Sequence, residues 1–209
     1  MNSVALVYRY VQQTKSFADI QTELIRKSIH ILIALVPSLA AFAGRSIALS
    51  LLAGGVVFYT YAEIQRVRGC SIPFITRITT AAARREDLYG KMILGPITLG
   101  LGAMISLLLY PQTASLIAIY ALAFGDSVSS IVGRAAGRIS LGPWRYKTLE
   151  GSLACFFMVL FVTFRVSGSL SCSFLVALTA TVLEAIPVHD LDNILIPMGS
   201  GLAACIALG

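Results

Sequence analysis

The chain has 209 residues, of which 57% are hydrophobic and only 12% charged, and its mean hydropathy is +0.83. Soluble domains carry about 25% charged residues, so this composition excludes an ordinary soluble domain as well as a disordered chain. The four cysteines are scattered without paired spacing, which excludes a disulfide scaffold and a cysteine-ligated zinc site. The net charge of +6 is not gathered in a basic, aromatic-rich stretch, so we expect no nucleic-acid partner. An integral membrane protein is the remaining class.

In chain order, residues 1–22 lack the long apolar run and small-residue cleavage site of a signal peptide, and we expect an interfacial segment. A transmembrane helix needs about 20 apolar residues, so the remainder can hold about seven short-looped helices. We therefore predict an all-α, polytopic membrane helix bundle that forms one catalytic domain over 23–209. Within it, 71–83 is predicted as an interfacial or re-entrant helix. The predicted transmembrane helices are 25–43, 46–64, 91–110, 113–133, 151–168, 171–188 and 193–209.

The charged residues predict how this bundle sits in the membrane. Alternate loops place fourteen of the sixteen Lys and Arg residues on one side, which predicts a cytoplasmic N-terminus. All ten carboxylates also fall in the predicted cytoplasmic segments or half-spans, although acidic residues contribute little to topology. Their one-sidedness indicates a polar site that faces the cytoplasm. We expect the protein in a prokaryotic cytoplasmic membrane.

Asp126 lies about two turns inside the fourth predicted helix. A charge near the middle of the membrane costs roughly 2.5–3.5 kcal/mol, and such residues usually face a cavity and act there. The alternative is a structural Asp in a helix that packs through its small residues.

Arg134 and Arg138 are four residues apart, so we expect them on one helix face. They either bind phosphates or extend to the interface as cations that set the topology.

Lys147 and Glu150 precede the fifth predicted helix. A lysine can hold a phosphate as a point charge, and a carboxylate can hold Mg²⁺. The residues alone support the alternative equally well. In that case Lys147 is an interfacial lysine, and Glu150 interacts favourably with the dipole at the start of the helix.

Glu184, Asp190 and Asp192 place three acids within nine residues beside an apolar hairpin. Hard oxygen ligands of this kind indicate a cation site, whereas turn chemistry explains Asp190 and Asn193 but not Glu184.

Arg26 and His30 open the first predicted helix, while Glu63 and Arg66 close the second on the same side. Because Arg26 and His30 are four residues apart, they share a helix face and are predicted to line the same pocket. An interfacial histidine is the alternative. The sequence has no Gly-x-Ser-x-Gly elbow, no Gly-x-x-x-x-Gly-Lys-Ser/Thr loop and no Gly-x-Gly-x-x-Gly after a strand. A nucleotide would therefore bind through an architecture specific to membrane proteins.

Taken together and in order, these motifs resemble the polytopic CTP-dependent lipid kinases, which include dolichol kinase, phytol kinase and the CTP-type diacylglycerol kinase, and more distantly phosphatidate cytidylyltransferase. The resemblance runs from about residue 23 to 200. The chain lacks the extra helices of long dolichol kinases, and Ser129 stands where a small Ala is frequent, so the compact phytol, prenol or diacylglycerol kinases are the better comparison. The motifs are Arg26-Lys27-x-x-His30, Glu63-x-x-Arg66, Gly125-Asp126 with Gly133-Arg134-x-x-Gly137, Lys147-Thr-x-Glu150-Gly151-Ser152, and Glu184 followed by Asp192-Asn193-x-x-x-Pro197.

The resemblance implies a kinase that transfers phosphate from CTP to a membrane-embedded lipid alcohol, with Mg²⁺ as cofactor. Phosphoryl transfer depends on Mg²⁺, on cations around the phosphates and on a carboxylate beside the attacking hydroxyl. The expected catalytic residues are Asp126, Lys147 and Glu150, with Glu184 and His30 as second choices for the base. Arg26, Lys27, Arg134, Arg138 and Lys147 are expected at the phosphates, and Asp126, Glu150, Asp192 and Asn193 at the metal ion, with Glu63 and Arg66 as further site residues.

Two other functions remain open at this point. A cytidylyltransferase would use the same CTP and Mg²⁺ but accept phosphatidate and release pyrophosphate. A secondary transporter would also carry intramembrane acids, but the sequence shows no convincing internal repeat, and its acids gather at one face instead of midway across the membrane. Besides CTP, the lipid alcohol and membrane lipids, a second copy of the chain is an open partner.

Overall fold

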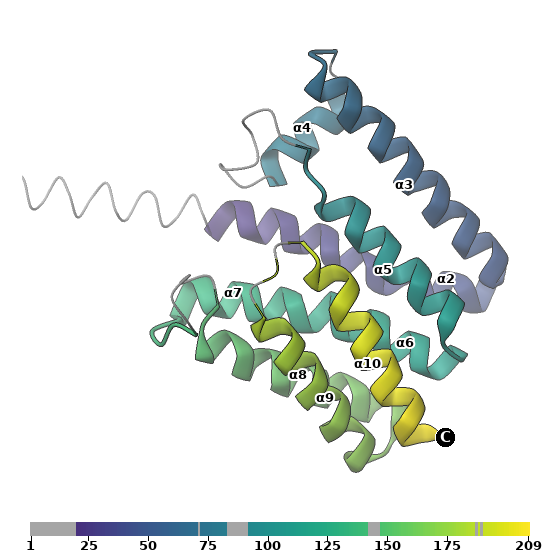
Figure 1. The fold of residues 1–209 in the computed structure, drawn as a ribbon, viewed down its shortest axis with the longest axis vertical. Coiled ribbons are helices and arrows are strands. Elements are labelled where there is room, and N and C mark those ends of the chain that lie inside the picture. Colours follow the sequence, from purple (N-terminus) through teal and green to yellow (C-terminus); the bar gives the residue numbers. More distant parts are fainter. Residues whose placement is uncertain (1–19, 71, 83–91, 142–146, 187, 189) are drawn as a thin grey trace, which may run out of the picture.

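The computed structural model describes residues 20–70, 72–82, 92–141, 147–186, 188 and 190–209. Within these ranges the protein consists of helices, apart from one isolated antiparallel bridge between Ser140 and Thr148 (Figure 1). The fold class predicted from the sequence is therefore confirmed as all-helical. The interfacial segment predicted for 1–22 lies almost entirely outside the described residues.

The first helix, Ile20–Ala43, is interrupted by the 3-10 turn η1, Ile33–Leu35, and continues as α2, Val36–Ala43. Pro37 at the start of α2 explains the interruption, because proline has no N–H to donate to the preceding turn. Gly44 then adopts a φ of 96° that favours glycine, and the chain turns directly into α3.

The central part of the chain holds one helix pair and one long composite helix. The π-helical segment η3 joins α6 to α7, so these three elements form one continuous helix of 25 residues. Pro111 precedes α6, a position where a missing N–H costs no helical hydrogen bond. The bounds are α3 Arg45–Val67, α4 Pro73–Ala82, α5 Gly95–Leu109, α6 Gln112–Tyr120, η3 Ala121–Asp126 and α7 Ser127–Ala136.

The last three helices, α8 (Leu149–Ser167), α9 (Leu170–Ala185) and α10 (Asp192–Leu208), have recognisable boundary signals. The Thr148 and Ser169 hydroxyls accept hydrogen bonds from the backbone N–H groups of Gly151 and Cys172, which caps the starts of α8 and α9. Between these two helices, Gly168 takes the left-handed conformation common at helix ends.

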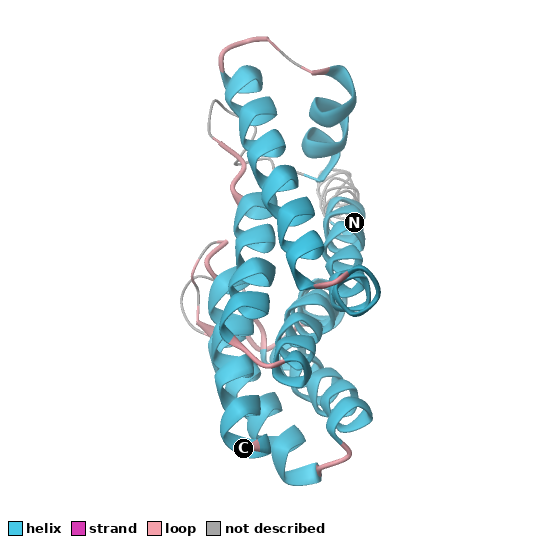
Figure 2. Ribbon diagram, turned by 90° about the vertical axis from the view of Figure 1, so that its right-hand side faces the viewer, coloured by secondary structure: helices cyan, strands magenta, loops and turns pink. Residues whose placement is uncertain are grey.

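The helices pack as a continuous series in which α8 contacts α9, α9 contacts α10, α10 contacts α5 and α5 contacts α3. In Figure 1, α3, α5 and α10 run side by side, while the first helix and the composite helix cross behind them. Turned by 90°, the molecule is elongated, with α4 near one end and the C-terminus at the other (Figure 2). Small residues such as Ala118, Ala123 and Ala180 are fully buried, whereas Phe42, Val57 and Ile206 are largely exposed. Exposed apolar side chains on packed helices are expected where lipid covers the surface.

Each of the seven predicted apolar segments coincides with a helix. Four of the described helices are long and apolar enough to cross a membrane, and α5, α9 and α10 are shorter apolar helices. The structure thus supports a membrane protein with four candidate spans, while the count of seven and the cytoplasmic N-terminus stay predictions. The segment predicted as interfacial or re-entrant over 71–83 contains the helix α4. The candidate spans are Ile20–Ala43, Arg45–Val67, Gln112–Ala136 and Leu149–Ser167.

Candidate functional site

Asp126 is the last residue of the π-helical segment η3 and is 1% exposed. A π turn inside an α-helix is rare and frequently occurs at functional sites. The preceding Gly125 lets η3 approach α8 closely, since a Cβ atom there would lie 2.6 Å from Cγ2 of Val159 and 3.2 Å from Sγ of Cys155. The local sequence therefore packs Gly125 against α8 and buries the carboxylate of the next residue, Asp126, in the helix bundle.

Asp126 is met by two residues of the first helix. Lys27 donates to its Oδ2 atom, and Nδ1 of His30 lies 3.4 Å from the same oxygen. Lys27 is 2% exposed and His30 is 5% exposed. The Oδ1 atom of Asp126 and the Nδ1 atom of His30 are buried without a hydrogen-bond partner. Such unpartnered buried atoms are uncommon in native proteins, and a bound ligand would satisfy them.

Three further charges extend this group. The Glu23 carboxylate accepts one contact from Arg26 at 2.6 Å and another from Arg134 of α7 at 2.9 Å. Glu23 is 2% exposed, whereas the Arg134 side chain is 37% exposed and lies at the rim. We call these residues together the Asp126 cluster: Glu23, Arg26, Lys27, His30, Asp126 and Arg134.

A second group surrounds Glu184 on α9. Its Oε1 atom accepts from the Ser129 hydroxyl at 2.5 Å and from the Lys147 ammonium at 2.7 Å, and its Oε2 atom accepts from the Ser152 hydroxyl at 2.9 Å. Asp192, at the start of α10, lies 3.8 Å from Lys147. We call Ser129, Lys147, Ser152, Glu184 and Asp192 the Glu184 cluster.

The two clusters meet where η3 joins α7 and form one polar region. Asp126 and Ser129 are three residues apart, and both side chains are buried. Asp126 contacts the Asp126 cluster, and Ser129 contacts Glu184 of the Glu184 cluster. The close approach of α8 that brings in Ser152 depends on Gly151, where a Cβ atom would lie 2.8 Å from the backbone oxygen of Ser129. Residues from five separate helices thereby meet in one buried polar region.

Sequence reasoning missed Glu23, Ser129 and Ser152 as members of this region. Glu23 and Ser129 carry no motif of their own, whereas Ser152 ends the motif that begins at Lys147 but was given no role, since serine is also a common packing residue between membrane helices. For Glu23 and Ser129 the available signal was spacing, because Glu23 stands three residues before Arg26 and Ser129 three residues after Asp126.

Lys147 lies between α7 and α8, outside the four candidate spans. Its burial acts to lower its pKa, but the nearby carboxylates of Glu184, Asp126 and Asp192 outweigh that effect and raise the pKa above its ordinary value. The side chain is therefore held as an ammonium ion at neutral pH.

Two other predicted residues are not brought into these clusters. The Glu150 carboxylate accepts hydrogen bonds from the backbone N–H of Ile139 at 3.2 and 3.3 Å. Arg138 is exposed and lies beyond the end of α7, so it does not share a helix face with Arg134 as predicted. The helix ends at Ala136 because Gly137 takes an extended conformation.

Glu63, Arg66 and Asn193 connect helices instead. The Glu63 carboxylate, 1% exposed, accepts two hydrogen bonds from Arg66 and one at 2.7 Å from the backbone N–H of Ile93. Asn193 donates to Oγ1 of Thr98 at 2.9 Å, which ties α10 to α5. The Oδ1 atom of Asn193 is buried and unpartnered, next to Asp192 in the chain.

The residues present fit the oxygen-ligand chemistry of Mg²⁺. Within the described ranges, no three His, Cys, Asp or Glu side chains are grouped to hold a metal ion by themselves. Mg²⁺ bound with a nucleotide needs only one or two carboxylates, because phosphates and water complete its coordination. Asp126, with its unpartnered Oδ1 atom, and Asp192 provide two such carboxylates in the joined clusters.

Comparison with known proteins gives one similarity. The chain is 28% identical over 143 residues to a protein named probable phytol kinase 1, chloroplastic, of Oryza sativa subsp. japonica. The aligned region makes up 60% of this chain and 46% of that protein, so it spans less than half of the relative's length. No family model and no solved structure matches the chain.

Proposed function

We propose that this protein is a CTP-dependent kinase that phosphorylates a membrane-embedded lipid alcohol. The observation that carries the proposal is the buried polar region in which Oδ1 of Asp126 and Nδ1 of His30 have no partner. A purely structural ion-pair network rarely leaves such atoms unsatisfied. The similarity to a phytol kinase supports a lipid kinase, and the four candidate spans support a membrane protein, in which a lipid substrate would be at hand.

The residues of the two clusters have the properties that phosphoryl transfer requires. The cations Arg26, Lys147 and Arg134 would bind the triphosphate, with Arg134 at the exposed rim where the nucleotide enters. When bound, Mg²⁺ would neutralise charge on the phosphates, with Asp126 and Asp192 as its protein ligands. Each of these cations contacts a carboxylate in the structure, so nucleotide binding would exchange carboxylate contacts for phosphate contacts.

The transfer itself needs an oriented hydroxyl group. The alcohol oxygen attacks the γ-phosphorus of CTP, the bond to the bridging oxygen breaks, and CDP leaves with that electron pair. The hydroxyl proton passes to the His30–Asp126 pair, whose facing atoms lie 3.4 Å apart. The products are the lipid monophosphate and CDP.

A direct assay tests the proposal. Purified protein in lipid-containing detergent is supplied with CTP or ATP labelled at the γ-phosphate and with farnesol, phytol, a polyprenol, diacylglycerol or phosphatidate. We expect labelled lipid monophosphate and CDP from CTP with one of the alcohols. Release of pyrophosphate from CTP with phosphatidate would instead identify a cytidylyltransferase, and no product from any combination would reject both enzymes.

The Asp126→Asn variant links this activity to the site. It keeps the side-chain shape and removes the charge, so we expect loss of turnover even in the protein that folds and inserts. Under a purely structural role the variant would lose stability, because Lys27 loses its carboxylate partner, but the protein that still folds would keep its turnover. Wild-type turnover in this variant would contradict the assigned site.

A further inference from the structure

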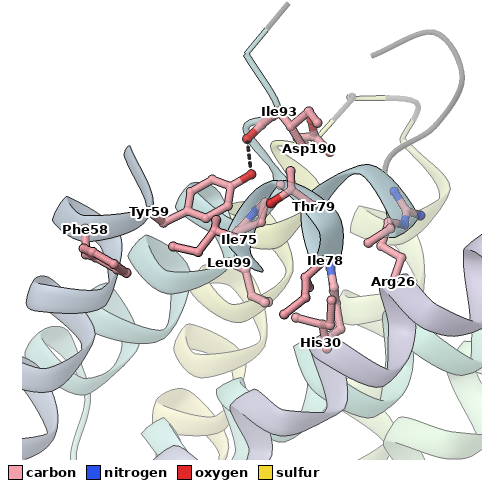
Figure 3. A pocket seen from close by; sticks show the side chains of 14 residues that line it. Arg26, His30, Phe58, Tyr59, Ile75, Ile78, Thr79, Ile93, Leu99 and Asp190 are labelled. Atoms are coloured by element: carbon pink, nitrogen blue, oxygen red, sulfur yellow. Dashed lines mark hydrogen bonds between the residues drawn. The ribbon is translucent and has the colours of Figure 1, made fainter. Parts of the chain in front are cut away.

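An apolar pocket of about 260 Å³ lies between the first helix, α3, α4 and the start of α5 (Figure 3). Ile75 and Ile78 of α4 lie on one side of it, and Leu99 of α5 and Phe58 of α3 line other parts. The proposed phosphate chemistry uses Arg26 and His30 at its edge but gives the apolar part of this space no role. Its other lining residues are Arg26, Ile29, His30, Tyr59, Thr79, Ala82, Ile93, Gly95, Pro96 and Asp190.

The helix α4 covers this pocket with one of its faces. Ile75, Ile78, Thr79 and Ala82 recur at spacings of three and four residues, so they share the helix face that lines the pocket. Arg77 is exposed on a different face. With ten residues α4 is far shorter than the roughly 20 needed to cross a membrane, which suits it to lie over other helices.

The pocket is apolar along most of its wall and polar where it reaches the Asp126 cluster. Ile78 is 42% exposed and Phe58 57% exposed, so apolar side chains form an opening on the outer surface. At the inner part stand Arg26 and His30, whose Nε and Nδ1 atoms are buried and unpartnered. Tyr59 lines the wall between, but its hydroxyl already donates to the backbone oxygen of Ile93 at 3.2 Å (Figure 3).

We propose that this pocket holds the hydroxyl-bearing end of a single-chain lipid alcohol, with its hydrocarbon against α4 and α5 and its hydroxyl at His30. The assignment rests on the proposed kinase function. His30 lines the pocket and faces Asp126 through its Nδ1 atom, so its ring suits a hydroxyl group, and the apolar opening suits a hydrocarbon chain that continues into lipid. The volume lies below the 300–1,000 Å³ typical of pockets for drug-sized ligands, which favours one chain over the two chains of diacylglycerol.

Enlarging a pocket side chain tests this placement kinetically. In Ile78→Trp the indole fills the space between α4 and His30, so the KM for phytol should rise roughly tenfold, the effect of about 1.4 kcal/mol of lost binding. The KM for CTP should stay at the wild-type value. Ile47→Trp, at an apolar position of α3 outside the pocket that is 51% exposed, is the matched control and should leave both constants unchanged. Ala82→Phe, one turn further along α4, repeats the test if Ile78→Trp does not fold.

Photolabelling separates the pocket from the kinase reaction. A diazirine analogue of phytol, added without nucleotide, should crosslink to α4 and α5, and excess phytol but not the matching alkane should compete. Labelling of this kind in a wild-type protein that phosphorylates nothing would support the pocket while rejecting the kinase. Conversely, an active wild type whose Ile78→Trp and Ala82→Phe variants keep the wild-type KM for phytol, with labelling elsewhere, would overturn the pocket and leave the kinase standing.

Discussion

At the residue scale, the charged side chains of the Asp126 cluster need oppositely charged partners because they are buried. Lys27 and Asp126 are each about 2% exposed, and their pairing offsets part of the cost of removing both charges from water. Removal of one member leaves the other as an uncompensated buried charge. The two residues therefore depend on each other far more than an exposed ion pair would.

We expect Lys27→Met to destabilise the protein by about 3–5 kcal/mol, the cost of breaking a buried pair. Unfolding in detergent, followed by heat or denaturant, measures the change. The double variant Lys27→Met with Asp126→Asn should recover much of the loss, because the orphaned charge is gone. Additive losses in the double variant would mean that the two side chains are not coupled. Arg68→Met, at an exposed position after α3, should change stability by less than about 0.5 kcal/mol.

Lys147 gives the clearest kinetic prediction at this scale. If its ammonium neutralises charge on the transferred phosphate, Lys147→Ala should lower kcat/KM for CTP by about 10³-fold, as losses of cationic groups do in phosphoryl transfer. Lys147→Arg should recover little, because a planar guanidinium does not replace a compact ammonium between Glu184 and Asp192. Arg165→Ala, on an exposed position of α8, is the control with unchanged kinetics. A wild-type rate in Lys147→Ala would remove this residue from the site.

At the element scale, the helix positions were predictable and the pairing of side chains between helices was not. Apolar runs of about 20 residues separated by charged or glycine-containing breaks mark membrane helices directly, and all seven runs became helices. The described part of the first helix already includes Ile20, ahead of the predicted start at 25, because a hydropathy criterion rejects the turn that carries Glu23. Arg26 and Lys27 follow within the predicted range. These charges are tolerated because they are satisfied within the protein.

In the candidate site too, positions within one helix were predictable, whereas contacts between helices were not. Arg26 and His30, which are related by helical spacing, line one pocket in the structure. In contrast, the serines that contact Glu184 come from two other helices, and a single sequence does not show which helices pack against each other. Arg138 was misplaced because the pattern did not show that α7 ends before it.

The π-helical segment η3 offers an element-scale prediction. Gly125→Ala would place a methyl group 2.6 Å from Cγ2 of Val159, so η3 and α8 must separate and Asp126 must shift. We expect a loss of stability of about 1–3 kcal/mol, together with a fall in kcat. The double variant Gly125→Ala with Val159→Ala should restore part of both, because it removes the clashing methyl groups. Failure of the second substitution to rescue either property would show that the close approach to α8 is not the cause.

Glu63 connects α3 to the start of α5 and hence fixes one wall of the apolar pocket. Glu63→Gln keeps the shape but weakens the charge-assisted bonds to Arg66 and to the N–H of Ile93, which should cost about 1.5–3 kcal/mol of stability. Unfolding in detergent measures this loss. Glu150→Gln, whose carboxylate bonds only at the surface, should be affected much less. Equal losses in the two variants would contradict a specific role for the α3–α5 connection.

At the scale of the whole molecule, the composite helix Gln112–Ala136 relates the site to the membrane. With 25 residues it is roughly 37 Å long, enough to cross a hydrocarbon core of about 30 Å. Asp126 and Arg134 belong to its second half, whereas Arg45 donates to the backbone oxygen of Tyr110, just before its start. The predicted topology puts the second half toward the cytoplasm, where CTP is present.

This topology can be tested by labelling the two ends of the composite helix. In a protein without native cysteines, Ile139→Cys should react with a membrane-impermeant maleimide only from the cytoplasmic side, and Thr113→Cys only from the outer side. Both positions are exposed, so burial would not mask the reaction. Intact cells and inverted vesicles provide the two sides, and phosphoryl transfer by each variant confirms a native fold. Reaction of Thr113→Cys from the cytoplasm would reverse the orientation and place the polar region away from its nucleotide, which the proposed kinase could not accommodate.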